Sequence, residues 1–382
     1  MPSSSHPLRN HIVDHDVGQT FNNEKYGVLS LKERLSLVAC ILELPFTVTA
    51  RIITSIGAAH NKSKSTRRVL GDATFKFLGD RLNYHQIQFV FGTSVNVYES
   101  WAKSNKLPIA VDDLGDTGGQ LFWIGSKQLD RVVLYMHGGG FVAPLQDYML
   151  DFWRSVQKTV EAQKVEVGFA VLAYSIIPDA GFPQQLRQAV EAVHHLVRAG
   201  VPMQNIQIVG DSAGANLVMQ LYSHILHPHP DVPPLSVTTK FSSMCLISPW
   251  ISMLGEGASS FESAKSVNDV MNPKTSRAWG ARVLQDVPDA YRPYVDAVNA
   301  PSGWFKGMDG IVDRILVIVG DAECPYNSTV VFEKDHLSKH HPSVTLFTQG
   351  DGVHDDPFME FFARSSKHGE AAKLICEWVA SG

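Results

Sequence analysis

Cysteine is scarce in this chain of 382 residues, which contains only Cys40, Cys245, Cys324 and Cys376. The four are widely separated, so none forms a Cys-x-x-Cys pair or a Cys/His cluster with the spacing of a zinc site. We therefore expect no disulfide framework and no metal site, and no motif indicates a cofactor.

Basic residues are fewer than acidic ones: the chain has 33 Lys or Arg and 38 Asp or Glu, which gives a net charge of −5. This balance offers no diffuse positive field for nucleic acid or anionic lipid, so we expect no nucleic-acid partner. Internal repeats and low-complexity tracts are absent. The hydrophobic share of 44% is enough to bury a large core, as in a globular protein.

A secretory leader is not visible at the start of the sequence. Residues 1–23 contain Ser, His, Asp and Asn but no apolar core of the signal-peptide type, so we expect a cytoplasmic protein. Leu35 to Ile56 is apolar enough to raise the question of a spanning helix. Because Glu43, Pro45 and Arg51 interrupt it, we expect that it does not span a bilayer.

The same segment has the spacing of an amphipathic helix. Leu31, Leu35, Val38 and Leu42 recur at intervals of three and four residues, which suits a helix packed on a protein body or lying on a bilayer surface. We favour packing, and peripheral membrane contact through this N-terminal helix stays open. A second helix is expected at Thr66 to Phe77.

From about residue 106 the chain alternates short apolar runs with helical patterns, which is typical of an α/β fold with a mostly parallel central sheet and helices on both faces. Leu107 to Trp123 reads as a hairpin around Gly118-Gly119. About 60 residues after Ser248 lack a clear strand and suggest an inserted lid. The expected strands are Val132–Met136, Val165–Tyr174, Ile206–Val209, Met244–Ser248, Ile315–Val319 and Val344–Thr348, and the expected helices are Gln146–Gln163, Phe182–Arg198, Ala215–Ile225, Ser328–Ser338 and Gly369–Val379.

A nucleophile motif follows the third of these strands, at Gly210-Asp211-Ser212-Ala213-Gly214. The glycines permit a tight strand-to-helix turn, which would present Ser212 Oγ at the start of a helix. A glycine loop, His137-Gly138-Gly139-Gly140, follows an earlier strand. Its backbone N–H groups, with that of Ala213, could hold an oxyanion. Neither a dinucleotide fingerprint nor a phosphate-binding P-loop fits these glycines, and His137 is expected to support the loop.

A base and an acid should follow Ser212 along the chain. His354 is the candidate base, because it lies in a polar loop after a strand, where we expect exposure and mobility to suit a proton carrier. Asp321 and Glu323 follow the preceding strand, and either could orient the imidazole.

These residues resemble the α/β-hydrolase-3 esterases, which are similar to hormone-sensitive lipase, and in particular their fungal members that resemble steryl acetyl hydrolases. The likeness covers about Leu107 to Ala380 and rests on the two motifs above and on Ser248-Pro249-Trp250. It implies an α/β-hydrolase fold, an oxyanion hole made by Gly139, Gly140 and Ala213, and a catalytic triad of Ser212, Glu323 and His354. Glu323 is preferred over Asp321 because the family acid follows a Gly-x-x-acid pattern, although Cys324-Pro325-Tyr326-Asn327 departs from the usual continuation.

The resemblance also implies a helical cap over the substrate pocket, built from residues 1–105 and an insertion at 252–299, with core parts at 106–251 and 300–382. Phe46, Phe75, Phe89, Phe91 and Trp279 are candidates to line the pocket. We expect a serine esterase for a bulky hydrophobic ester, such as an acetylated or lactone-type fungal metabolite of secondary metabolism or a sterol ester. An acyltransferase, a lactone-forming enzyme and a non-catalytic small-molecule receptor remain alternatives.

Overall fold

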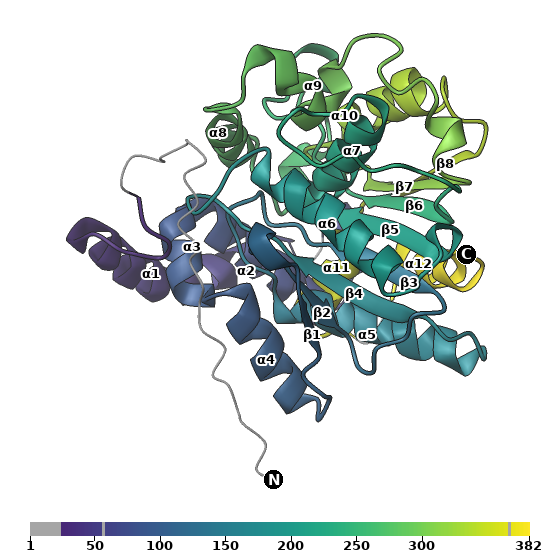
Figure 1. Cartoon of the computed structure of the whole chain (residues 1–382). Coiled ribbons are helices and arrows are strands. Elements are labelled where there is room, and N and C mark those ends of the chain that lie inside the picture. Colours follow the sequence, from purple (N-terminus) through teal and green to yellow (C-terminus); the bar gives the residue numbers. More distant parts are fainter. Residues whose placement is uncertain (1–23, 56–57, 366–367) are drawn as a thin grey trace.

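The computed structural model of the chain describes residues 24–55, 58–365 and 368–382 and is built around one eight-stranded sheet (Figure 1). The expectation of a non-secretory start rests on residues 1–23, which lie outside the described residues. In the sheet the strands are ordered β1-β2-β4-β3-β5-β6-β7-β8. Their bounds are β1 Val111–Asp113, β2 Gln120–Trp123, β3 Val132–Met136, β4 Gly168–Ala173, β5 Ile206–Asp211, β6 Ser243–Ile247, β7 Ile315–Gly320 and β8 Val344–Gln349.

The sheet is mostly parallel, as the alternation of strands and helices predicts. Strands β3 to β8 pair in parallel, and only β1 and β2 run against their neighbours. The expected hairpin is present, with Asp113 opposite Gln120. Gly118 has φ +70°, a left-handed conformation that a turn of this kind requires and glycine adopts without strain.

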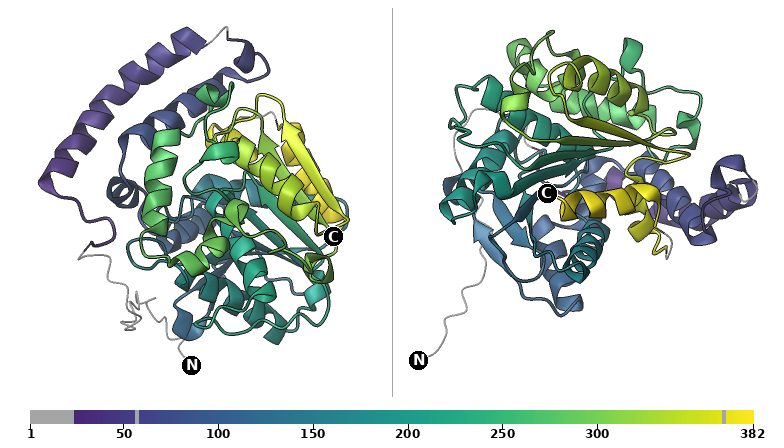
Figure 2. Two further views of the ribbon diagram at one scale, coloured as in Figure 1. Left: turned by 90° about the horizontal axis from the view of Figure 1, so that it is seen from above. Right: turned by 90° about the vertical axis from the view of Figure 1, so that its right-hand side faces the viewer.

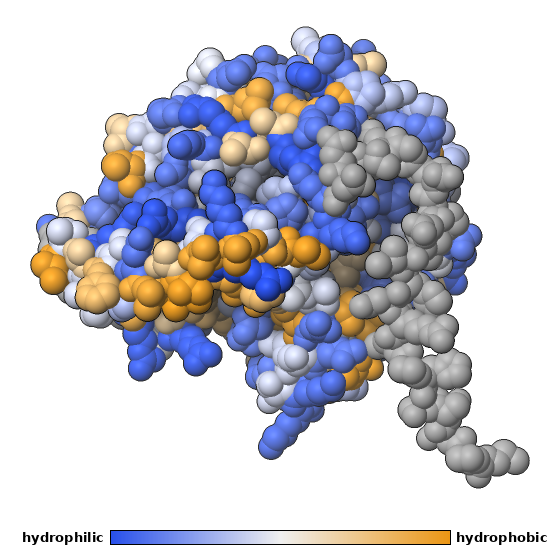
Figure 3. Space-filling view, turned by 90° about the vertical axis from the view of Figure 1, so that its left-hand side faces the viewer, coloured by the Kyte–Doolittle hydropathy of each residue, from blue (hydrophilic) through white to orange (hydrophobic). Residues whose placement is uncertain are grey.

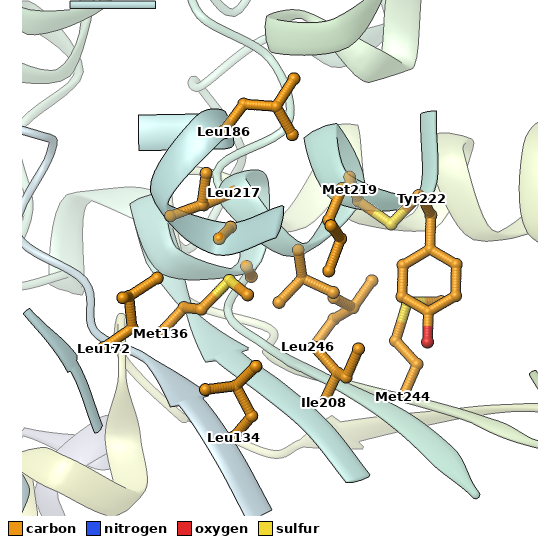
Figure 4. Packing of buried hydrophobic residues seen from close by; sticks show 14 of the residues in the cluster. Leu134, Met136, Leu172, Leu186, Ile208, Leu217, Met219, Tyr222, Met244 and Leu246 are labelled. Carbon is orange, nitrogen blue, oxygen red and sulfur yellow. The ribbon is translucent and has the colours of Figure 1, made fainter. Parts of the chain in front are cut away.

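Alternate side chains of the strands point into two separate apolar layers. One layer packs under α6 (Gln184–Arg198) and α7 (Ser212–Leu226), as Figure 4 shows for residues such as Leu134, Ile208 and Leu246. The other packs against α5 (Asp147–Ala162), α11 (Asp356–Phe362) and α12 (Glu370–Ala380). Because both faces are covered, the central strands are apolar on both sides, which explains their continuous apolar runs in the sequence.

The helices of the core differ from expectation in two places. α10 (Tyr326–Phe332) continues into a π-helical turn at Glu333–Leu337, so the helix expected at Ser328–Ser338 is found as two pieces. The loop expected after β8 is present, but the sequence patterns do not predict α11, which begins at Asp356, only two residues after His354. A proline at position 357, in the first turn of α11, suits a helix start and is the signal for α11 that the sequence offered.

Four helices precede the sheet: α1 (Leu31–Ser55), α2 (Thr66–Arg81), α3 (Tyr84–Phe91) and α4 (Ser94–Ser104). Figure 2 shows α1 at the periphery with α2 alongside it. The expectation that α1 packs through its regular apolar stripe is wrong. Leu31, Leu35, Val38 and Leu42 are 54–75% exposed, and the helix packs instead through the stripe that contains Leu37, Cys40 and Val48.

The segment between β6 and β7 contains helices and no named strand, as its sequence indicated. Its helices are α8 (Pro273–Leu284) and the short α9 (Arg292–Val295). α8 lies against the N-terminal helices, where Trp279 packs beside Phe77 and Leu82. α9 packs on α7, and Asn216 of α7 donates a hydrogen bond to the carbonyl of Val295. The division of the chain into core and cap segments stays a prediction.

Candidate active site

The turn from β5 into α7 holds Ser212 in a conformation that few residues adopt. Its φ is +48°, in the left-handed region, where a non-glycine residue is strained. The chain crowds this turn so closely that a Cβ added to Gly214 would lie 1.9 Å from the carbonyl oxygen of Met136. The glycines of the motif therefore allow β5, β3 and α7 to meet, and the strained turn presents the Ser212 hydroxyl beyond the strand end.

Three side chains from three distant loops meet at this point. Oγ of Ser212 lies 2.8 Å from Nε2 of His354, and Nδ1 of the same ring lies 3.2 Å from Oε2 of Glu323. The expectation of an exposed His354 is wrong, since it is only 6% exposed. The imidazole is therefore fixed between a hydroxyl and a carboxylate, which is the arrangement of a nucleophile, a base and an orienting acid.

Glu323, and not Asp321, is the acid that reaches the ring. Its other oxygen, Oε1, accepts hydrogen bonds from the hydroxyl of Ser248, at 2.7 Å, and from the backbone N–H of Gly320. Asp321 lies apart, where it binds Lys265 and accepts a hydrogen bond from the backbone N–H of Asp351. The two acids point in different directions because they stand two residues apart in one turn.

The charges around the ring favour a protonated imidazole. Burial lowers the pKa of His354, but the carboxylates of Asp355 and Glu323 outweigh it and raise this pKa above the ordinary histidine value. Burial raises the pKa of Glu323, and its hydrogen bond to His354 opposes that rise. A base with a raised pKa holds the proton of Ser212 more firmly, and it becomes unavailable as the pH falls.

The glycine loop is joined to the turn that carries Ser212. Gly138 donates its backbone N–H to Oδ1 of Asp211 at 2.9 Å, which ties the loop to the nucleophile turn. His137 Nδ1 lies 2.7 Å from the Gly138 carbonyl, and burial lowers the His137 pKa to about 4, so this ring is neutral. Gly139 and Gly140 line the cavity above Ser212.

Ala213 completes the set of expected oxyanion donors by its position. It is the second residue of α7, and the first amides of a helix have no acceptor within the helix. The positive end of the helix dipole also lies here, which favours negative charge beside Ser212. The start of α7 therefore provides a backbone N–H group and a dipole that suit an oxyanion next to Ser212.

Two residues that the sequence reasoning missed hold the His354 loop in place. Asp269, in the insertion, is fully buried and accepts hydrogen bonds from the backbone N–H groups of His354, at 2.8 Å, and Cys324, at 2.7 Å. Arg68 of α2 is also buried and binds the Asp356 carboxylate at 2.7 Å. No motif marks either residue, because each acts across a long stretch of chain.

A buried acid pair next to the imidazole was also missed. The carboxyl groups of Asp211 and Asp355 interact with each other, and one buried oxygen of each, Oδ2 of Asp211 and Oδ1 of Asp355, has no hydrogen-bond partner among the described residues. Burial raises the pKa of both, to about 6 for Asp211. Asp355 Oδ2 also lies 3.5 Å from Nε2 of His354. In the sequence, only the neighbouring aspartates Asp355 and Asp356 hint at an acid beside His354. The sequence does not show which of these two side chains turns toward the ring.

A cavity of about 740 Å³ opens above Ser212 and His354. Of the five aromatic candidates, Phe75, Phe91 and Trp279 line it. Phe46 and Phe89 do not, since they are 77% and 56% exposed on the outer surface. Other apolar lining residues are Leu78, Leu82, Ile87, Val90, Phe261 and Met271. The volume lies in the range of small-molecule sites, and the lining favours an apolar ligand.

Among residues 24–55, 58–365 and 368–382, no three His, Cys, Asp or Glu side chains are grouped so that they could hold an ion.

A family model described as alpha/beta hydrolase fold matches residues 133–355, which is more than half of the chain. The chain belongs to this family. The matched residues run from β3 to the loop of His354, so they contain all three elements of the site. The α/β-hydrolase fold and the α/β-hydrolase-3 resemblance expected from the sequence are confirmed.

Relatives of this α/β-hydrolase share moderate identity over part of their length. An acetyl-hydrolase of Streptomyces hygroscopicus is 31% identical over 140 residues, which cover 36% of this chain and 42% of the relative. Neutral cholesterol ester hydrolase 1 of Mus musculus is 23% identical over 255 residues, covering 62% of this chain and 59% of the relative. The matches therefore span about half of these relatives.

A solved structure shares the fold over nearly its whole length. An esterase from the bacterial hormone-sensitive lipase family superposes with a TM-score of 0.61 at 20% identity, covering 83% of this chain and 97% of that one. At this identity the match establishes the fold alone.

Proposed function

We propose that this α/β-hydrolase is a serine carboxylic-ester hydrolase that acts on a bulky hydrophobic ester. The contact that carries the proposal is the 2.8 Å approach of Ser212 Oγ to His354 Nε2, with Glu323 on the far side of the ring. A nucleophile, a base and an acid in this order are the requirement for acyl transfer through serine. The apolar cavity above them supports a hydrophobic substrate.

In the proposed reaction, Ser212 Oγ attacks the ester carbonyl while His354 Nε2 accepts the hydroxyl proton. The backbone N–H groups of Gly139, Gly140 and Ala213 stabilise the oxyanion that forms. His354 then gives the proton to the departing alcohol, which leaves an acyl-serine. Water attacks the acyl-serine with His354 again as base, and the acid is released with Ser212 restored. Glu323 holds the ring in the required tautomer throughout.

The names of the relatives narrow the class of ester that we propose as the substrate. Two of them are named for acetyl and cholesterol-ester hydrolysis, and a steryl acetyl hydrolase of Saccharomyces cerevisiae is 25% identical over 121 residues. An acetylated or lactone-type metabolite, or a sterol ester, has the apolar bulk that the cavity can bury. We therefore propose this substrate group for the protein.

The first experiment is labelling with a fluorophosphonate, which reacts with an activated serine. We expect one adduct on Ser212, located by peptide mass spectrometry, and none in Ser212→Ala. Ser36→Ala, at an exposed serine of α1, is the matched control and should label normally. Hydrolysis of p-nitrophenyl esters from acetate to palmitate should fall by about 10⁴ to 10⁶ in Ser212→Ala.

The outcomes separate the alternatives. An unlabelled and inactive protein with an intact circular-dichroism spectrum would contradict the proposal and favour a non-catalytic receptor. Labelling at Ser212 with ester transfer to an added alcohol, and without release of free acid, would favour an acyltransferase or a lactone-forming enzyme. Release of free acid with first-order loss of ester supports hydrolysis.

A further inference from the structure

Helix α1 is apolar on two opposite faces, and only one of them is covered. Leu37, Cys40 and Val48 face the protein, where the first two pack with Phe77, Leu82 and Ile87. The opposite face carries a second apolar stripe, in which each side chain is 54–77% exposed: Leu31, Leu35, Val38, Leu42, Phe46 and Ile53. A soluble helix normally has one apolar face, so the outer stripe needs a partner.

The outer stripe belongs to a larger apolar surface. Of the fourteen exposed large apolar residues in the described part of the chain, eleven lie between positions 28 and 90. Figure 3, which views the side of the molecule where α1 lies, shows apolar residues gathered in a long band. Contiguous patches of this kind mark interaction surfaces, whereas isolated exposed apolar residues do not.

The charge of this region differs in sign from that of the whole protein. Residues 24–81 contain ten Lys or Arg and five Asp or Glu, a local net charge of +5, while the full chain carries −5. Lys32 and Arg34 are exposed at the start of α1, beside Leu31 and Leu35. Cations next to an exposed apolar stripe complement the surface of a bilayer that contains anionic lipid.

Contacts on its inner face hold α1 along the protein. Glu43 binds Arg81, and Arg51 lies 3.5 Å from Asp80, so two charged pairs join α1 to α2. By length and composition the segment Leu31–Thr54 could cross a membrane, with a mean hydropathy of 1.7. Spanning would require both pairs and the packed face to separate from α2. The observed packing favours a helix that lies in the interface plane.

The cavity above Ser212 is next to this surface. Leu82 and Ile87 belong to the same apolar cluster as Leu37 and Cys40 of α1, and both also line the cavity. Val90 of α3 also lines the cavity and is 48% exposed, and its neighbour Phe89 is 56% exposed. The exposed apolar residues of α1 and α3 therefore lie next to the wall of the proposed substrate site.

We propose that α1 docks this protein on an anionic bilayer surface, with its outer stripe in the lipid and the cavity wall at Val90 toward the membrane. A hydrophobic ester could then pass from the bilayer to Ser212 without crossing water. The docking step stands on α1 alone, whereas the delivery of substrate rests on the proposed esterase function.

The test uses the full chain and vesicles of phosphatidylcholine with or without 30% phosphatidylserine. We expect sedimentation with the phosphatidylserine vesicles, weakened by salt and by Lys32→Glu with Arg34→Glu. The triple variant Leu35→Ser, Leu42→Ser, Phe46→Ser should bind at least about tenfold more weakly. Val267→Ser, at a residue 76% exposed in the insertion, is the matched control and should bind as the parent does.

Activity separates docking from catalysis. Hydrolysis of a soluble short-chain p-nitrophenyl ester should be unchanged in the triple variant, while hydrolysis of a vesicle-embedded ester should fall by about the loss in binding. If the protein binds vesicles but has no esterase activity, the docking proposal is supported and the proposed function is wrong.

Three results would overturn the docking proposal. The first is that the parent protein does not bind vesicles, and the second is that the triple variant binds as well as the parent. The third is resistance of the membrane-bound protein to extraction at alkaline pH, which would mean that α1 spans. If the parent is a dimer that the triple variant converts to a monomer, and vesicle binding is absent, a second copy of the chain is the partner instead.

Discussion

Ser212 and His354 lie 2.8 Å apart, but different parts of the molecule hold them. Ser212 is fixed locally, by a tight turn between β5 and α7 at the centre of the sheet. His354 is fixed from a distance, by Asp269 of the insertion and by Arg68 of α2 through Asp356. The nucleophile therefore depends on the core, and the proposed base depends on the segments that cover it. A disturbance of these covering segments should weaken the base while the turn at Ser212 stays intact.

The largest effect on stability is expected at Gly214, in the tight turn between β5 and α7. Gly214→Ala places a Cβ 1.9 Å from the Met136 carbonyl oxygen, and the three nearest atoms are all backbone atoms of Met136 and His137, which cannot rotate away as a side chain could. We expect the free energy of unfolding to fall by about 5 kcal/mol or more, or no soluble protein. Urea denaturation measures this change. Gly79→Ala, where no atom lies within 4 Å of the added Cβ, is the control, and equal stability of the two variants would contradict a rigid turn.

The second effect tests the distant support of His354. Arg68→Met removes the cation that binds Asp356 and also Asp72, at 2.6 Å, and leaves a buried carboxylate without its partner. We expect a loss of about 3–5 kcal/mol in the free energy of unfolding. The neighbouring Arg67 is exposed, so Arg67→Met should change stability by less than about 0.5 kcal/mol. An Arg68→Met protein as stable as Arg67→Met would show that α2 does not support the loop.

The third effect concerns kcat. Asp269→Asn keeps the shape of the side chain but replaces one acceptor oxygen with a donor, so it cannot bind both the His354 and Cys324 amides as before. Misplacement of the ring should lower kcat about 100-fold with little change in KM. Asp289→Asn, at an exposed carboxylate of the same insertion, is the control. Unchanged kcat in both variants would mean that the loop holds its position without Asp269.

The smallest effect is a shift in pH dependence. Protonated His354 cannot accept the Ser212 proton, so kcat/KM should fall as the pH falls through the raised pKa of His354, with a midpoint above 6.5. Asp355→Asn removes the carboxylate whose Oδ2 lies 3.5 Å from Nε2 of His354 and which raises the pKa of the ring. The His354 pKa should then drop, and the midpoint should move to lower pH by less than about one unit. A shift to higher pH would contradict this assignment.

The sequence predicts those site residues that lie in short motifs next to a strand, and it does not predict those that act across long stretches of chain. Ser212 and the glycine loop follow strands within a few residues, and the turns they make require glycine at fixed places, so their sequence is distinctive. Glu323 was favoured over Asp321 only through the family pattern, because side-chain direction in a short turn depends on the fold. Neither Asp269 nor Asp355 belongs to a motif. Asp269 binds backbone groups that are distant in sequence, and the side chain of Asp355 is turned inward by the backbone of its loop.

Helix α1 shows that the limit on what the sequence can predict also applies to a whole helix. Its sequence determined that a long apolar helix forms, and the strand pattern likewise determined a mostly parallel sheet covered on both faces, because apolar spacing reflects the geometry of the backbone. Only the tertiary structure decided which of two apolar stripes on α1 is buried, and that His354 is enclosed. Burial depends on which distant surfaces meet, and the periodicity of one segment carries no information about its partners.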